Sequence, residues 1–173
     1  VYITGILPII KYDSQTALNS FIEYNMIQPK GIEKYFGFTE EEVKVLCNES
    51  GMSFSEVNNW FGGYTVGNSS GIFNPNSVME AIHSGDCDLY WRTTGAGDEL
   101  SPYLRYELRS DVEKMIRGES VTVDTTSFEN NIKDIDSRDK VITMLIHLGY
   151  LSYDNGEAHI PNMELLLYFA SCI

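Results

Sequence analysis

The sequence predicts an α+β fold that is mainly helical, with small β elements in short hairpins. Three observations support this prediction. Several amphipathic segments begin at a capping residue and end at a glycine, as short surface helices do. Turn sequences at 67–71 and at Asn155-Gly156 separate short apolar or aromatic runs, a pattern typical of β-hairpins. With 173 residues, the chain can form one hydrophobic core or two small subdomains that share an interface.

Composition and charge restrict the class of partner. Hydrophobic residues make up 43% and charged residues 21% of the chain, as in soluble globular proteins. The formal net charge is −13, which disfavours direct nucleic-acid binding, because such binding draws its affinity from cationic side chains on phosphates. It disfavours an anionic membrane surface as well. No apolar run approaches the roughly 20 residues of a membrane-spanning helix, so we expect no membrane association.

The first segment, 1–12, is expected to be a terminal strand of a truncated core. Residues 1–10 are almost continuously apolar, which is typical of a strand buried on both faces of a parallel sheet. The chain opens on such a strand without methionine and closes on the apolar run 165–173 without a stop signal. We therefore expect it to be a fragment of a longer protein.

The second segment, 13–98, is predicted to be a helical region. A helix is expected from Asp13 or Ser14 to about residue 24, followed by a connector at 29–37. Thr39 and Glu42 form a capping box, and Gly51 ends the helix that it starts. Further helices are expected to run from Ser53 or Ser55 to residue 61 and from 75 to 83, and a loop with Tyr90-Trp91 as its anchor to occupy 86–98.

A hairpin at 64–73 lies inside this region. Gly62-Gly63 ends the preceding helix, and Asn74-Pro75 begins the next one as N-cap and N1 residues. We expect strands at 64–66 and 72–73 around a turn at 67–71. Glycine-rich turns can cradle phosphate, but no basic residue lies in 60–75, so a fixed connection between helices is favoured. Trp60, Tyr64, Tyr90 and Trp91 are expected to pack in a core; a ligand platform is the alternative.

The third segment, 99–173, is predicted to be a winged-helix-like region. A helix at 100–117 and a strand at 120–124 precede the most apolar helix, which begins at Asp136 or Ser137 and stops at Gly149. A hairpin around Asn155-Gly156 follows, and Asn162 caps the last helix. Arg138 and Lys140 are the basic residues at the start of the apolar helix, and Asp136 and Asp139 neutralise them, which disfavours DNA recognition by this helix.

Motifs with known chemistry are missing from the sequence. It contains no phosphate-binding loop, no dinucleotide fingerprint, no metalloprotease motif and no paired Cys-x-x-Cys. The cysteines and histidines are isolated and show no metal-ligand spacing: Cys47, Cys87, Cys172, His83, His147 and His159. We therefore predict no catalytic residue and no metal site. Three separate free thiols favour a reducing, cytoplasmic setting.

Several runs together resemble a predicted AAA-ATPase-like family of bacterial proteins, whose members usually carry a PD-(D/E)XK nuclease domain after the ATPase region. The runs occur in the same order over nearly the whole chain: 2–9, 36–43, 60–64, 73–78, Tyr90-Trp91 with Thr93-Thr94-Gly95, 148–151 and Ile160-Pro161-Asn162. One departure is Gly62, where the family usually has an acidic residue. The phosphate-binding loop and the acidic metal-binding strand are absent from this sequence.

The resemblance implies that this chain is the C-terminal lid and winged-helix region, which relays nucleotide state to a partner or to the appended nuclease. Thr4 would then be a nucleotide-sensing residue, and ATP and Mg²⁺ would be cofactors of the parent only. A plain structural role is the alternative for Thr4, since a β-branched residue suits a strand. By the same resemblance, 1–12 would be a terminal strand of the truncated ATPase core and 13–98 its helical, lid-like region. The partner would be the rest of that core. Two other functions stay open: a stand-alone winged-helix module for protein or nucleic acid, and an enzyme with an unrecognised acidic site.

Overall fold

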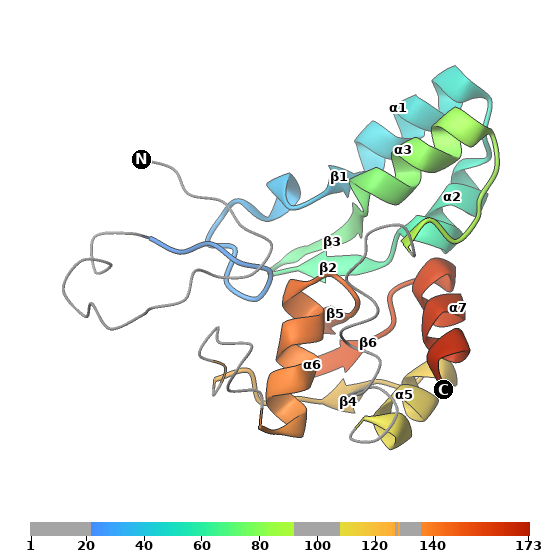
Figure 1. Ribbon diagram of the computed structural model, residues 1–173. Coiled ribbons are helices and arrows are strands. Elements are labelled where there is room, and N and C mark those ends of the chain that lie inside the picture. Colours follow the sequence, from blue (N-terminus) through green and yellow to red (C-terminus); the bar gives the residue numbers. More distant parts are fainter. Residues whose placement is uncertain (1–21, 92–107, 127, 129–135) are drawn as a thin grey trace.

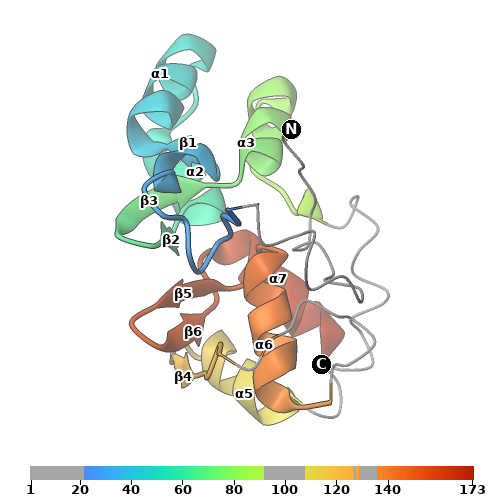
Figure 2. The same ribbon diagram turned by 90° about the vertical axis from the view of Figure 1, so that its left-hand side faces the viewer.

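The computed structural model describes residues 22–91, 108–126, 128 and 136–173. These residues form an α+β fold of six α-helices and two three-stranded antiparallel sheets (Figure 1), as the sequence predicts. We refer to 22–91 as the N-terminal half and to the described residues from 108 onward as the C-terminal half. Each half contains one of the sheets, and the two halves lie one above the other (Figure 2).

The N-terminal half contains three α-helices and one three-stranded sheet. Its elements are η2 (Glu33–Tyr35), β1 (Phe38–Thr39), α1 (Glu40–Ser50), α2 (Phe54–Phe61), β2 (Tyr64–Val66), β3 (Ser69–Phe73) and α3 (Pro75–Ser84). The strand order is β1-β3-β2. The helix boundaries follow the predicted caps. Thr39 and Glu42 form the capping box, with the Thr39 amide donating to the Glu42 carboxylate at 2.8 Å, and Gly51 ends α1 in the left-handed conformation.

The hairpin between α2 and α3 is tighter than the sequence indicates. We expected its second strand at 72–73 after a five-residue turn, but β3 already begins at Ser69. The turn is therefore Gly67-Asn68, and the strand register shifts between Tyr64 and Thr65. A positive φ of 71° at Gly71 lets β3 continue through a residue that looked like part of the turn.

The C-terminal half packs two helices and a three-stranded sheet around α6. Its elements are α5 (Arg109–Ile116), β4 (Val121–Thr122), α6 (Arg138–His147), β5 (Ser152–Asp154), β6 (Glu157–His159) and α7 (Met163–Cys172). The strand order is β4-β6-β5. Asn155 and Gly156 form the predicted tight turn with positive φ angles of 49° and 87°, and Asn162 caps α7 as predicted.

The buried apolar side chains form two clusters. One lies among α1, α2 and α3, and its centre includes Val43, Phe61 and Phe73. The other surrounds α6 and α7, and Tyr64, Val66 and Ile72 of the β2–β3 hairpin belong to it. The hairpin therefore contributes residues to both clusters. This arrangement fits the fixed connection expected of the 60–75 stretch.

Some expectations fall partly or wholly on residues that the structure does not describe. The strand at 1–12, Thr4, most of the helix at 13–24, the end of the loop at 86–98 and the start of the helix at 100–117 are among them. Residues 22–24 are described and are not helical, so a helix extending to residue 24 is wrong. The strand predicted at 120–124 is shorter, since only Val121–Thr122 pair with β6. No helix in the described ranges has both the length and the apolar character needed to cross a membrane.

Candidate functional site

The two halves meet where the β2 strand runs beside β5. The Tyr64 hydroxyl donates a hydrogen bond to the carbonyl of Gly149 at 2.8 Å, and the Thr65 amide donates to the Ser152 hydroxyl at 2.9 Å. Burial, reinforced by the charge of Glu164, raises the pKa of Tyr64 well above its ordinary value. Tyr64 therefore acts as a neutral hydrogen-bond donor inside the protein, and its predicted role as a packing anchor is confirmed.

The Gly62-Gly63 pair contacts the segment before α7. The Asn162 side-chain amide donates to the carbonyl of Gly62 at 2.9 Å, while its oxygen accepts from the amide of Leu165 at 3.1 Å. Gly63 has a φ of 84°, and a Cβ at this position would lie 2.0 Å from the carbonyl oxygen of Pro161. Only glycine allows the two backbones to approach this closely. Gly63 thus does more than end a helix, which was its expected role.

Glu164 is the central residue of this contact region. One of its carboxylate oxygens, Oε1, accepts hydrogen bonds from the Ser77 hydroxyl at 3.1 Å and from the amides of Tyr90 and Trp91 at 2.9 Å each. Ser77 is fully buried on α3, and only 1% of the Glu164 surface is exposed. We call Gly62, Tyr64, Ser77, Tyr90, Trp91, Asn162 and Glu164 the joint, because their buried and partly buried hydrogen bonds connect the N-terminal half to α7 and the residues around it.

Two opposing effects act on the pKa of the Glu164 carboxyl group. Burial raises its pKa, because a charged carboxylate loses its hydration inside a protein, and the three hydrogen bonds counteract this effect. Glu164 is also the second residue of α7, where the helix dipole favours an anion. Within the described ranges, no lysine, arginine or histidine forms an ion pair with it. Hydrogen-bond donors and the helix start therefore stabilise the charge in this part of the protein.

The four aromatic residues that could have formed a ligand platform are divided between the two clusters. Trp60 is half-buried and Tyr90 packs on Phe61 with ring centroids 6.1 Å apart, both at the edge of the N-terminal cluster. Tyr64 and Trp91 belong to the other cluster, where Trp91 meets Tyr150 edge-on at 5.1 Å. The rings serve packing, as expected of them.

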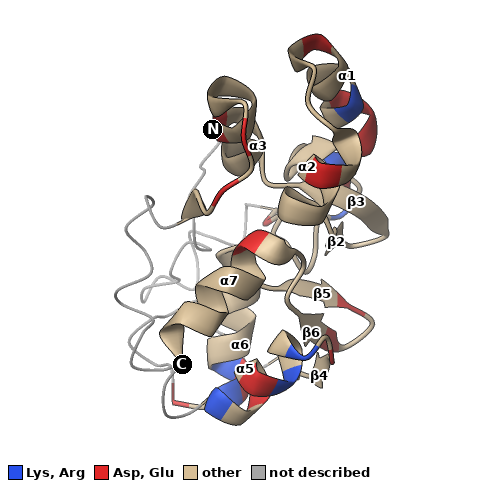
Figure 3. Cartoon of the chain, turned by 90° about the vertical axis from the view of Figure 1, so that its right-hand side faces the viewer, with Lys and Arg blue, Asp and Glu red and all other residues tan. Residues whose placement is uncertain are grey.

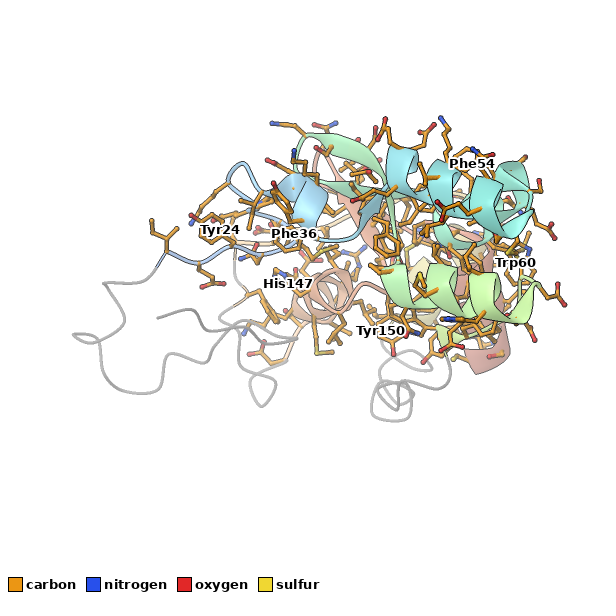
Figure 4. The ribbon with its side chains drawn as sticks, turned by 90° about the horizontal axis from the view of Figure 1, so that it is seen from above. Tyr24, Phe36, Phe54, Trp60, His147 and Tyr150 are labelled. Atoms are coloured by element: carbon orange, nitrogen blue, oxygen red, sulfur yellow. The ribbon has the colours of Figure 1, made fainter. Side chains whose placement is uncertain are left out.

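Helix α6 has no exposed residue: Val141 to Ile146 are buried and its remaining residues are partly buried. The segment that contains Met26 and Phe36 packs against its cluster, and Phe36 and His147 lie on the same side of the molecule in Figure 4. Burial lowers the pKa of His147, and the nearby Glu23 carboxylate partly offsets this effect.

The basic residues at the start of α6 form ion pairs with carboxylates, as predicted. Arg138 donates to both oxygens of Asp111 at 2.7 and 3.1 Å and also pairs with Asp139. Lys140 pairs with Asp136 at 2.8 Å. Basic residues of α5 and α6 accordingly lie among acidic ones in Figure 3. These cations face carboxylates of the protein itself, an arrangement that disfavours phosphate binding by α6.

Of the isolated cysteines and histidines, Cys47 and Cys87 come together in the N-terminal apolar cluster. Cys47 and Cys87 are buried free thiols, and burial raises the pKa of Cys87 to about 11, which makes it a poor nucleophile. Burial also lowers the pKa of His159, while His83 is exposed on α3. In the part of the chain that the structure describes, no three such side chains could hold a metal ion together.

Sequence reasoning missed Glu164 and Ser77. An acidic residue in the first turn of a helix is ordinary, and a lone serine in a helix has no special signal. Their importance comes from tertiary contacts between residues 87 positions apart, which no local pattern encodes. Thr4, the proposed nucleotide sensor, lies outside the described residues. Comparisons of this chain with protein-family models, curated proteins and solved structures found no match.

Proposed function

We propose that this chain is the non-catalytic lid and winged-helix region of an AAA-ATPase-like protein, and that it relays the nucleotide state of the ATPase core to a partner or to an appended nuclease domain. The observation that carries the proposal is the joint. A relay needs two bodies connected firmly enough for displacement of one to move the other. The buried hydrogen bonds of Asn162 and Glu164 and the partly buried one of Tyr64 supply such a connection.

The order of elements in the C-terminal half supports the winged-helix part of the proposal. Helix α5 is followed by β4, then by α6 and by the β5–β6 hairpin, and β4 pairs with the second strand of that hairpin. In a winged helix, α6 would be the recognition helix. Its burial and the carboxylate partners of Arg138 favour a role in protein contacts over DNA contacts.

The cofactors in this proposal belong to the parent protein. ATP and Mg²⁺ would bind the phosphate loop and the acidic strand of the core, neither of which is in this sequence. Thr4 is the one residue of the chain proposed to sense nucleotide, through its hydroxyl at the end of a parallel strand. The proposed setting is the cytoplasm, since the three cysteines are compatible with reduced thiols.

Two measurements test the proposal. The coding sequence on either side should encode a GxxxxGK[ST] loop upstream and a nuclease-type Asp…Glu-x-Lys motif downstream; a gene without the upstream loop would overturn the family assignment. The purified 173-residue chain should hydrolyse no ATP in the presence of Mg²⁺. Sustained turnover that survives further purification would overturn the non-catalytic role.

The alternative is a stand-alone winged-helix module that binds another protein. The tip of the β5–β6 hairpin favours it, because Asp154, Asn155 and Glu157 are exposed there and form an acidic wing. Such a wing suits a basic protein surface and repels a nucleic-acid backbone. A gel shift with duplex DNA at moderate salt separates the classes, because tight binding would contradict both the relay and the acidic module.

A further inference from the structure

We propose that Glu164 is a conformational latch: the segment around Tyr90 and Trp91 detaches locally from α7 without unfolding of either hydrophobic cluster, and a proton on Glu164 holds it closed. This inference rests on the proposed function only for its biological purpose. The latch itself concerns contacts within the 173-residue chain and is measurable there.

The geometry places the latch between separate parts of the chain. The three donors on Glu164 Oε1 come from α3 and from the 90–91 segment, 73 to 87 residues away in the sequence, and none comes from α7. Two of them are backbone amides. The amide of Trp91 binds water once the segment moves away, and the amide of Tyr90 also donates to the carbonyl of Asp88 at 3.1 Å within its own segment. Detaching the 90–91 segment therefore breaks both hydrogen bonds to this one oxygen, together with the ring contacts of Tyr90 on Phe61 and of Trp91 on Tyr150.

Detachment also returns a buried charge to water. An ionised carboxylate that is almost fully buried loses much of its hydration free energy, and its hydrogen bonds restore part of it. The closed state of an ionised Glu164 is thus a balance of large opposing contributions. The side chains of the apolar clusters carry no charge that loses hydration on burial. Local opening at Glu164 therefore requires less free energy than unfolding of the clusters.

The effect of a proton follows from the same balance. Because burial outweighs the hydrogen bonds, the pKa of Glu164 is raised in the closed state. The closed state therefore binds a proton more tightly than the open state. Lowering the pH through the raised pKa of the closed state favours closure. Neutral Glu164 still accepts hydrogen bonds from the three donors through Oε1. Because it carries no charge, the free-energy cost of removing a charged carboxylate from water is absent.

Neighbouring ionisable groups do not interfere with this titration. Tyr64 on β2 faces Glu164, but its raised pKa keeps it neutral throughout the relevant range. Cys87, in the adjoining segment, stays a thiol for the same reason. The charged groups on the described elements that pack nearby are exposed or partly exposed to solvent: Glu56, Glu80, His83, Asp86, Asp88, Arg109, Asp111, Glu113 and Lys114.

For the relay, the latch provides a place where the two halves uncouple. Tyr90 packs on Phe61 of the N-terminal cluster, whereas Trp91 packs on Tyr150 of the C-terminal cluster. Movement of the 90–91 segment thus changes contacts with both halves at once. A partner that displaces this segment would loosen α7 from α3.

Amide hydrogen exchange of Tyr90 and Trp91 in the full 173-residue chain tests the latch. After correction for the intrinsic pH dependence, both amides should exchange by local opening, and their protection should increase as the pH is lowered from 8 toward 4.5, the ordinary pKa of a glutamate. One pKa unit between open and closed states corresponds to about a tenfold change in the opening equilibrium. In Glu164→Gln the pH dependence should vanish. In Glu164→Ala the two amides should exchange about tenfold faster or more, while the thermal transition stays cooperative.

Glu42→Gln is the matched control. Glu42 also accepts hydrogen bonds from a backbone amide and a hydroxyl, both of Thr39. It is exposed, however, and connects α1 only to its own N-cap residue. Its substitution should leave the exchange of Tyr90 and Trp91 unchanged. Exchange of these amides only through global unfolding, or a pH dependence that persists in Glu164→Gln, would overturn the latch. Neither result bears on the flanking genes or on ATP turnover, so the proposed function is judged separately.

Discussion

The side chain of Asn162 connects residues 100 positions apart: its amide group donates to the carbonyl of Gly62 at 2.9 Å while its oxygen caps α7. One residue thus fixes both the start of the last helix and the end of α2. This dual role distinguishes Asn162 from Thr39, Ser53, Asn74 and Ser137, the other side chains that cap α-helices in the described ranges, because each of those caps only its own helix. Asn74, for example, bonds through its side-chain oxygen to the amide of Asn76 at 3.0 Å.

Replacing Asn162 should therefore destabilise the protein more than replacing Asn74. Loss of a cap costs about 1 kcal/mol, and the buried carbonyl of Gly62 left without a donor adds roughly 1–3 kcal/mol. We expect Asn162→Ala to lower the free energy of unfolding by roughly 2–4 kcal/mol and Asn74→Ala by about 1 kcal/mol. Chemical denaturation measures both. Equal losses would show that the bond to Gly62 contributes nothing.

Gly63 and Gly85 offer a second matched comparison. Both have a positive φ, but a Cβ at Gly85 would meet no atom within 4 Å, whereas at Gly63 it would collide with the carbonyl of Pro161. Gly85→Ala should cost about 1 kcal/mol of stability through backbone strain alone. Gly63→Ala should cost at least roughly 2 kcal/mol more, because the two halves must separate to admit the methyl group. Denaturation midpoints that coincide for the two variants would contradict this close approach.

Local sequence signals predicted the helix caps and one hairpin turn well. The capping box of Thr39 and Glu42, the Asn74-Pro75 start and the Asn155-Gly156 turn each depend on residues within four positions, so a linear pattern contains all the information. The turn of the other hairpin was placed wrongly, because Gly71 reads as a turn residue and instead lies within β3.

The joint could be predicted only in part. Asn162 was recognisable as a cap, and Tyr64 as a packing residue. Glu164 looked like any first-turn acid, because the property that makes it special is its burial against Ser77 and the 90–91 segment. Burial depends on how helices distant in sequence pack together, and a sequence with many carboxylates gives no means of choosing one among them.

His147 should make stability depend on pH. Burial lowers its pKa in the folded protein from an ordinary value of 6.5, so below that value the unfolded chain binds the proton more tightly. The contribution of His147 to stability is therefore complete above about pH 6.5 and is lost as the pH falls toward the lower folded pKa. Denaturation series between pH 5 and 8 should show a smaller loss at acidic pH in His147→Gln than in the wild type. His83→Gln, at an exposed site, should behave as the wild type; a matching change there would contradict the assignment.

Arg138 should prove to be a structural residue and not a phosphate ligand. Its guanidinium holds both oxygens of Asp111 on α5 and also donates to the carbonyl of Thr122 at 3.0 Å, so it ties α5, β4 and α6 together. A double-mutant cycle with Arg138→Gln and Asp111→Asn should give a coupling of about 1 kcal/mol, reduced by the partial exposure of Arg138. The exposed pair Arg109 and Glu113 within α5 is the control, with an expected coupling of roughly 0.3–0.5 kcal/mol.

Duplex DNA should not bind the wild type or Arg138→Gln in a gel shift at moderate salt. If the wild type bound DNA and Arg138→Gln lost that binding without losing stability, α6 would be a recognition helix after all.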